Sequence, residues 1–127
     1  MRDIEFRAMN TNNQWRYGYL ERESLLYDEN YDCSSTIQID TIGQFTGLKD
    51  KNGKKIYEGD IVRGKDYGGL RREGVVEYDK YNAIYNIVPK TKSEYRDCSI
   101  ITSLSPAEEY LEIIGNIYDN PELVKGK

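Results

Sequence analysis

Two carboxylates in the middle of the chain raise the question of metal-dependent hydrolysis. Asp60 and Glu77, with Asp79 and Lys80 nearby in the sequence, are the residue types that hold a divalent cation in a two-carboxylate nuclease. The usual nuclease pattern places an acidic residue two positions before a lysine on one strand face. Here Asp79 directly precedes Lys80, and Glu77 stands three positions before it. The spacing does not fit, so we interpret these side chains as solvated turn residues. A metal-dependent hydrolase is the least favoured of three hypotheses.

Other catalytic chemistry finds little support in the residue types. The sequence contains no histidine, which removes Ser-His-Asp and Cys-His nucleophile systems and histidine metal ligands. An EF-hand with Gly53 at loop position six would have Leu48 and Gly59 at its two ends, and neither is a carboxylate. The glycine-rich stretch 63–69 lacks Gly-Lys-Ser/Thr and is therefore no phosphate-binding loop. We predict no enzyme activity and no metal or other cofactor.

The charge pattern leaves nucleic-acid binding open as an alternative. The net charge is −4, which argues against a generic binder of duplex DNA. The segment from Lys49 to Arg72 is nevertheless rich in basic residues, and with a tyrosine it forms a candidate surface for a partner or for single-stranded nucleic acid. The members of this basic segment are Lys49, Lys51, Lys54, Lys55, Arg63, Lys65, Tyr67, Arg71 and Arg72.

The chain contains two cysteines, Cys33 and Cys98. The N-terminus is charged from Arg2 onward and does not resemble a signal peptide, so we expect reduced thiols in a cytosol. A Cys33–Cys98 disulfide is the alternative. No apolar run approaches the ~20 residues of a membrane-spanning helix.

Alternating residues predict strands along the N-terminal part of the chain. Residues 3–9 and 15–20 alternate between apolar or aromatic and polar positions around an Asn-rich turn, which predicts a hairpin. Residues 21–35 are weakly patterned, and we expect a loop or edge region; the alternative is a short strand of Leu25, Leu26, Tyr27 and Tyr31 around an Asp-Glu-Asn turn. Residues 36–42 alternate and are rich in β-branched side chains, which predicts another strand.

Turn signals organise the rest of the chain. Asn52-Gly53 predicts a type I′ hairpin turn, and Gly59 allows a sharp entry into the next strand. Strands are predicted over 73–78, 83–88, 97–102 and 110–118, with short helical turns at 105–108 and 120–123. The fold class is therefore mainly β: antiparallel hairpins with a small SH3-like open barrel and at most one or two short helical turns. We expect a single domain over 1–127, with a hairpin region at about 1–45 and a barrel-like region at about 46–127.

Three blocks of sequence resemble the YopX family, whose members are small proteins carried mainly by phages and prophages of Gram-positive bacteria. The blocks are residues 4–8, 43–62 and 112–123, so the resemblance spans the whole chain. The motif residues that carry it, which we expect to be largely structural, are Gly43, Gln44, Thr46, Gly47, Asn52, Gly53, Glu58, Gly59, Asp60, Gly115, Asn116 and Pro121.

The resemblance implies a β-rich fold and a cytoplasmic setting in a bacterial host, and it transfers no catalytic residue. The sequence contains 12 tyrosines, a residue type common in sheets and in contact surfaces. Our leading hypothesis is therefore a non-enzymatic phage accessory protein that binds a host or phage protein or associates with itself, with the central hairpin and adjoining turn from Gln44 to Asp60 as the expected contact region. The alternative is a small barrel that binds single-stranded nucleic acid through the basic segment. Binding to a membrane is not expected.

Overall fold

A computed structural model of the chain describes residues 4–65, 71–79, 83–89 and 110–123. Within these ranges the secondary structure consists of β-strands and short helical turns, which confirms the predicted mainly β class. The chain divides into two compact units, Met1–Gly47 and Leu48–Lys127. That the two units form a single domain stays a prediction. No helix in the described ranges is long and apolar enough to cross a membrane.

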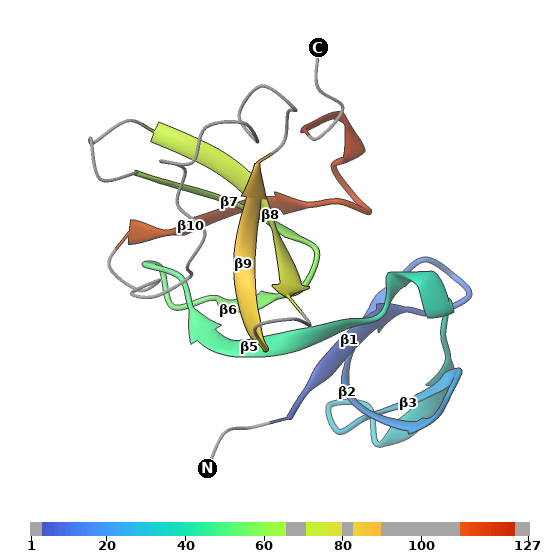
Figure 1. Ribbon diagram of the computed structural model, residues 1–127. Helices are drawn as coiled ribbons and strands as arrows, with labels where there is room; N and C mark the ends of the chain where they lie inside the picture. The colour runs from blue at the N-terminus through green and yellow to red at the C-terminus, as the bar shows by residue number, and fades with distance from the viewer. Residues whose placement is uncertain (1–3, 66–70, 80–82, 90–109, 124–127) are drawn as a thin grey trace. The chain divides into compact units, whose positions relative to one another are not determined.

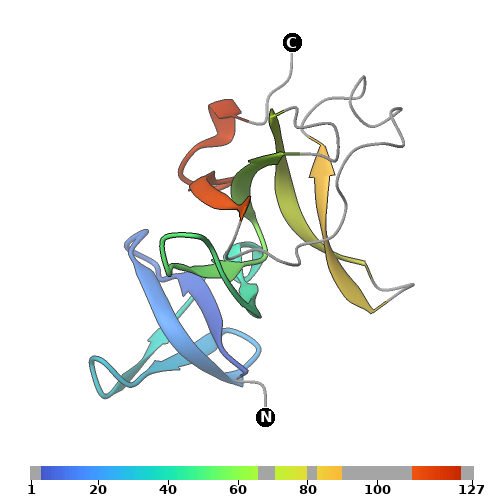
Figure 2. The same cartoon turned by 90° about the vertical axis from the view of Figure 1, so that its left-hand side faces the viewer.

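The first unit is an antiparallel sheet in the order β4-β3-β2-β1-β5 (Figures 1 and 2). Its predicted N-terminal hairpin is confirmed, with Phe6 opposite Gly18 and Met9 opposite Trp15. The apolar positions on one face form a core of Ala8, Leu26 and Ile37. The elements are β1 (Phe6–Met9), β2 (Trp15–Arg22), β3 (Leu25–Asp28), β4 (Cys33–Thr36), the 3-10 helix η1 (Ile39–Thr41) and β5 (Gly43–Lys49), which continues into the second unit.

The structure corrects the predicted loop over residues 21–35. This segment contains the end of β2, all of β3 and most of β4, and the alternative short strand corresponds to β3. The buried Asp28 holds the turn between β3 and β4, because its Oδ1 accepts the N–H of Asn30 at 2.9 Å. Its Oδ2 accepts the N–H of Tyr17 at 3.2 Å, which ties the turn to β2. The Asp28 carboxylate thus stabilises a hairpin that the weak pattern of apolar residues did not predict.

The structure also corrects the predicted strand over residues 36–42, which is interrupted by a short helical turn. Only Thr36 belongs to a strand, and Ile39–Thr41 forms η1. The hydroxyl of the buried Thr41 accepts the N–H of Met9 at 2.9 Å and donates to the carbonyl of Gln38 at 2.7 Å. These two hydrogen bonds favour a tight turn against β1, because they give the buried Thr41 hydroxyl both a donor and an acceptor. A continuous strand would place that hydroxyl away from these partners.

The second unit contains a four-stranded antiparallel sheet in the order β10-β7-β8-β9 (Figure 1). Its core packs Ile56, Val62, Val76, Ile87 and Leu111. The predicted strands over 73–78, 83–88 and 110–118 and the helical turn at 120–123 are confirmed with shifted bounds. The elements are β6 (Lys55–Tyr57), β7 (Asp60–Lys65), β8 (Arg71–Asp79), β9 (Ile84–Pro89), β10 (Glu112–Asn116) and the 3-10 helix η2 (Pro121–Leu123).

Some predicted elements lie outside the described residues. These are the strand over 97–102 and the helical turn at 105–108. The four-stranded sheet of the second unit is compatible with the predicted open barrel, and the SH3-like topology stays a prediction. Cys33 is a free, exposed cysteine on β4, whereas Cys98 is not among the described residues.

Candidate functional site

The Asn52-Gly53 hairpin forms, but its turn is not the predicted type I′. Gly53 has φ of +82°, whereas Asn52 is not among the described residues with positive φ. The carbonyl of Asp50 accepts the N–H of Gly53 at 3.0 Å, and the N–H of Asp50 donates to the carbonyl of Lys54 at 2.8 Å. This pattern is a three-residue loop with glycine in the left-handed position. The prediction was wrong because it considered Asn52 and Gly53 alone and not the side chain of Asp50.

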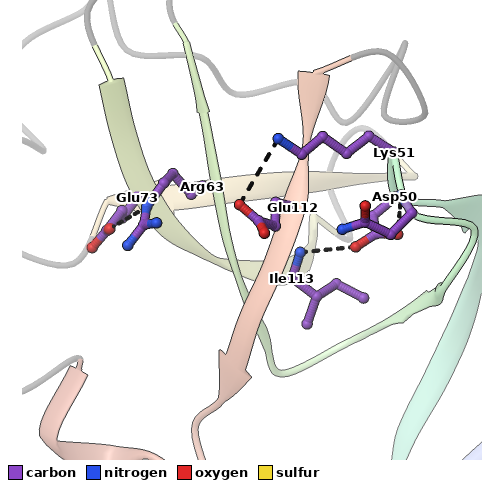
Figure 3. Close-up of polar contacts among 7 residues, drawn as sticks. Asp50, Lys51, Arg63, Glu73, Glu112 and Ile113 are labelled. Atoms are coloured by element: carbon purple, nitrogen blue, oxygen red, sulfur yellow. Dashed lines mark hydrogen bonds and ion pairs between the residues drawn. The ribbon is translucent and has the colours of Figure 1, made fainter.

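The Asp50 side chain determines the conformation of this loop. Asp50 is 1% exposed, and its Oδ1 accepts the N–H groups of Asn52 and Lys54, both at 2.9 Å. Its Oδ2 accepts the N–H of Ile113 on β10 at 3.0 Å (Figure 3). One buried carboxylate therefore satisfies three backbone donors and joins the turn to a strand 63 positions away.

A second buried carboxylate organises the other end of this motif. Asp60 is 2% exposed, and its Oδ2 accepts the N–H of Tyr57 at 2.8 Å. Gly59 has φ of +90°, which confirms its predicted place at a sharp turn. The carbonyl of Gly59 accepts the N–H of Ile117 at 2.9 Å. The Asp60 carboxylate thus has a structural role, as does the glycine before it.

The remaining motif residues also serve the backbone. In the first unit Gln44 stands opposite Phe6 and Gly43 opposite Arg7, Thr46 is buried, and Gly47 has φ of +89°.

In the second unit the Oδ1 of Asn116 accepts the N–H groups of Tyr118 and Asp119 at 3.0 and 2.9 Å. Gly115 stands opposite Ile61 at a β-bulge, Pro121 begins η2, and Glu58 is partly exposed in the turn before β7. The middle sequence block is therefore hydrogen-bonded to both the first and the last.

The basic segment is partly neutralised by acidic side chains. The Nε of Arg63 lies 2.8 Å from the Oε2 of Glu73 on the neighbouring strand, and the Nζ of Lys51 lies 3.9 Å from the Oε1 of Glu112 (Figure 3). The other members fall into three groups: Lys49, Lys54 and Lys55 are exposed, Lys65, Arg71 and Arg72 are placed only by the β7–β8 register, and Tyr67 lies outside the described residues. Among the described residues, no group of three or more Cys, Asp or Glu side chains is arranged to hold a metal ion.

Four aromatic side chains, two exposed and two half-buried, lie on one face of β2 and β3, and we call this the tyrosine face: Trp15, Tyr17, Tyr19 and Tyr27. The three β2 residues alternate along the strand, and Tyr27 stands opposite Tyr19, so all four share one side of the sheet. Tyr19 is 47% exposed and Tyr17 is 38% exposed. The alternation of aromatic and other residues at positions 15–20 of the sequence was the signal for a shared face.

The geometry of the tyrosine face is fixed by its own contacts. The rings of Tyr19 and Tyr27 lie 5.3 Å apart between centroids. The hydroxyl of Tyr27 donates to Asp32 Oδ1 at 2.5 Å, and this hydrogen bond raises the pKa of Tyr27 to about 12. The guanidinium of Arg7 lies 4.7 Å from the centre of the Trp15 ring. The exposed ring of Tyr19 is thus supported by Tyr27, whose own position is set by a hydrogen bond, and the half-buried ring of Trp15 is held by a cation–π contact.

A similar tyrosine pair in the second unit provides a comparison. Tyr78 on β8 is also 47% exposed, and its ring centroid lies 5.1 Å from that of Tyr85 on β9. Tyr78 therefore matches Tyr19 in residue type, exposure and aromatic neighbour. Tyr78 lacks the row of aromatic side chains that β2 carries.

Comparisons with known proteins agree with the family resemblance that the three sequence blocks carry. The family model described as YopX protein matches residues 2–125. The chain belongs to the YopX family. The crystal structure of protein EF1440 from Enterococcus faecalis resembles this family member with a TM-score of 0.60 and 24% sequence identity, over 98% of this chain and 100% of that one. That likeness shows a shared fold. The search of the curated proteins found no match for this YopX chain.

Proposed function

We propose that this YopX family member is a non-enzymatic accessory protein of phage or prophage origin that binds a protein partner in the cytoplasm of its bacterial host. The observation that carries the proposal is the tyrosine face, where Tyr17 and Tyr19 expose 38% and 47% of their surface on one side of β2. Tyrosine, tryptophan and arginine are enriched at the energetically dominant positions of protein interfaces.

The arrangement of the tyrosine face supports this use. A tyrosine has few rotatable bonds, so ordering its side chain on binding costs little conformational entropy. The stacking of Tyr19 on Tyr27, and the hydrogen bond from Tyr27 to Asp32, reduce that cost further because the contact geometry already exists in the free protein. A face of this kind suits a partner that supplies apolar or cationic groups above the rings.

The motif residues support a binding role over a catalytic one. Asp50 and Asp60 use carboxylate oxygens to hold backbone N–H groups of turns and of β10. Their burial below 3% exposure removes both from contact with a dissolved substrate. The part of the chain that carries the family resemblance therefore builds the scaffold, and the exposed aromatic surface lies elsewhere.

Nucleic-acid binding through the basic segment is less favoured. Arg63 is ion-paired with Glu73, and Lys51 lies near Glu112, so fewer cations remain to neutralise phosphates. The second unit also contains 14 basic and 14 acidic residues, which leaves its formal charge at zero. Three exposed lysines on the hairpin are a small basis for such a function.

The test is partner capture with matched variants from a lysate of bacteria that carry the gene. Immobilised wild-type protein should retain a specific partner, Tyr19→Ser should lose it, and Tyr78→Ser should keep it. Analytical ultracentrifugation of the free protein separates self-association from binding to another protein, because self-association predicts a mass that rises with concentration. A monomer that captures the same proteins before and after Tyr19→Ser would contradict the proposal.

A further inference from the structure

Acidic side chains border the tyrosine face. Ser34 on β4 stands opposite Tyr27, which stands opposite Tyr19, so these three residues form one cross-strand row. The Oγ of Ser34 donates a hydrogen bond to the carboxylate of Glu21, which places that carboxylate at the same row. Asp32, in the turn between β3 and β4, places a second carboxylate next to this row through its hydrogen bond with the Tyr27 hydroxyl.

The first unit as a whole is also negatively charged. Residues 1–47 contain eight acidic and four basic side chains. Two of the four arginines already lie over aromatic rings of this unit. Arg7 is 4.7 Å from the centre of Trp15, and Arg16 is 4.4 Å from the centre of Tyr31. The unit thus shows twice that its aromatic side chains accept a guanidinium group.

We propose that the tyrosine face receives an arginine-rich, extended segment of a partner protein. Guanidinium groups would stack over Tyr19 and Tyr17, and neighbouring arginines would pair with the carboxylates of Glu21 and Asp32. Electrostatic complementarity favours such a cationic segment and opposes nucleic acid, whose phosphates would be repelled by the same carboxylates. This inference rests on the proposed function, because it specifies the chemistry of the partner at the same face.

The test uses the full-length protein and a defined probe. A fluorescein-labelled dodecapeptide of alternating glycine and arginine is titrated by fluorescence anisotropy, with a glycine–glutamate peptide and a twelve-nucleotide oligothymidylate as the other probes. We expect saturable binding of the arginine peptide that weakens with added salt, and no saturable binding of the other two. Equal binding of the glutamate peptide, or tighter binding of the oligonucleotide, would overturn the proposal.

Four variants separate a specific site from general attraction to an acidic protein. Tyr19→Phe keeps the ring and should keep the affinity, whereas Tyr19→Leu keeps apolar bulk and should weaken binding about two- to fivefold, the range of an exposed cation–π contact. Glu21→Gln should weaken binding about two- to fivefold, as for an exposed ion pair. Glu77→Gln removes the same charge from an exposed position on β8 and should have no such effect. Circular dichroism spectra confirm that all four variants fold.

The outcomes distinguish this inference from the proposed function. If Glu21→Gln and Glu77→Gln have equal effects, or if Tyr19→Leu binds like wild type, the arginine-rich segment is ruled out. If partner capture in the lysate still depends on Tyr19 in that case, protein binding at this face stands with a partner of different chemistry. If neither the peptide nor the lysate partner depends on Tyr19, both proposals fail.

Discussion

The carboxylate of Asp50 accepts the backbone N–H of Ile113 at 3.0 Å, and these two residues are 63 positions apart. The N–H of Lys51 likewise donates to the carbonyl of Leu111 at 2.9 Å. The central hairpin is thus hydrogen-bonded to β10, which begins the last sequence block, and to the residue before it. The most distinctive stretch of the sequence is explained by this structural role.

Asp50→Asn should destabilise the protein by about 1–3 kcal/mol, the range for a buried donor or acceptor left unsatisfied. An asparagine keeps one carbonyl oxygen for the turn, but its amide nitrogen would then face the N–H of Ile113, or the reverse if the amide is turned round. The free energy of unfolding in urea measures the loss. Asp40→Asn is the control, because Asp40 is exposed on η1 and its change should stay within about 0.5 kcal/mol. Equal losses in the two variants would contradict the role assigned to Asp50.

Gly53→Ala should cost about 1–2 kcal/mol of stability, because an L residue is strained at φ of +82°. Nothing lies within 4 Å of a Cβ atom built at this position, so the cost comes from the backbone alone. Gly53→Asn should cost less, since asparagine tolerates the left-handed region. Thermal unfolding of the two variants compares them directly. Equal losses for alanine and asparagine would show that the left-handed conformation is not what makes glycine necessary.

The pH dependence of stability should contain a contribution from Tyr27. Its pKa is raised from 10.0 to about 12 in the folded protein, first through the hydrogen bond to Asp32. The folded state therefore holds the phenolic proton more strongly than the unfolded state does. The stabilisation is fully present below pH 10 and is lost as the pH rises through 12. Titration of the assigned tyrosine ¹³Cζ signals by NMR should find a late resonance for Tyr27, and Asp32→Ala should return it toward 10. A Tyr27 resonance that titrates near 10 in wild type would contradict this contact.

The basic segment should bind single-stranded nucleic acid only weakly. We expect oligothymidylate anisotropy to stay flat at physiological salt up to tens of micromolar protein, because Arg63 is engaged by Glu73 and the first unit is acidic. The paired variant Lys54→Glu, Lys55→Glu is the control for any residual signal. Tight, salt-sensitive binding that this variant abolishes would restore the nucleic-acid alternative.

Local sequence patterns predicted the first hairpin and the positions of the central turns. The alternation around Phe6 and Tyr17 predicted the first hairpin, and Gly53 and Gly59 indicated the turns of the central stretch. These features depend on neighbouring residues, so periodicity and turn propensity suffice to find them.

The features that the sequence did not predict depend on long-range contacts. Residues 36–42 have a strand pattern, yet Thr41 is drawn into η1 by its hydrogen bond with Met9, 32 positions earlier. The hairpin of β3 and β4 depends on Asp28 and its bond to Tyr17. The candidate binding face was missed for the same reason. Tyr27 becomes part of it only through its register with Tyr19 on β2.

The central claim is that the tyrosine face contacts a protein, and site-specific photo-cross-linking tests it most directly. A benzophenone amino acid replaces Tyr19 in one full-length variant and Tyr78 in the other, two positions that are both 47% exposed. After irradiation in the bacterial host, we predict a discrete adduct with one protein at position 19 and none at position 78. The same adducts at both positions, or no adduct at position 19, would contradict the account.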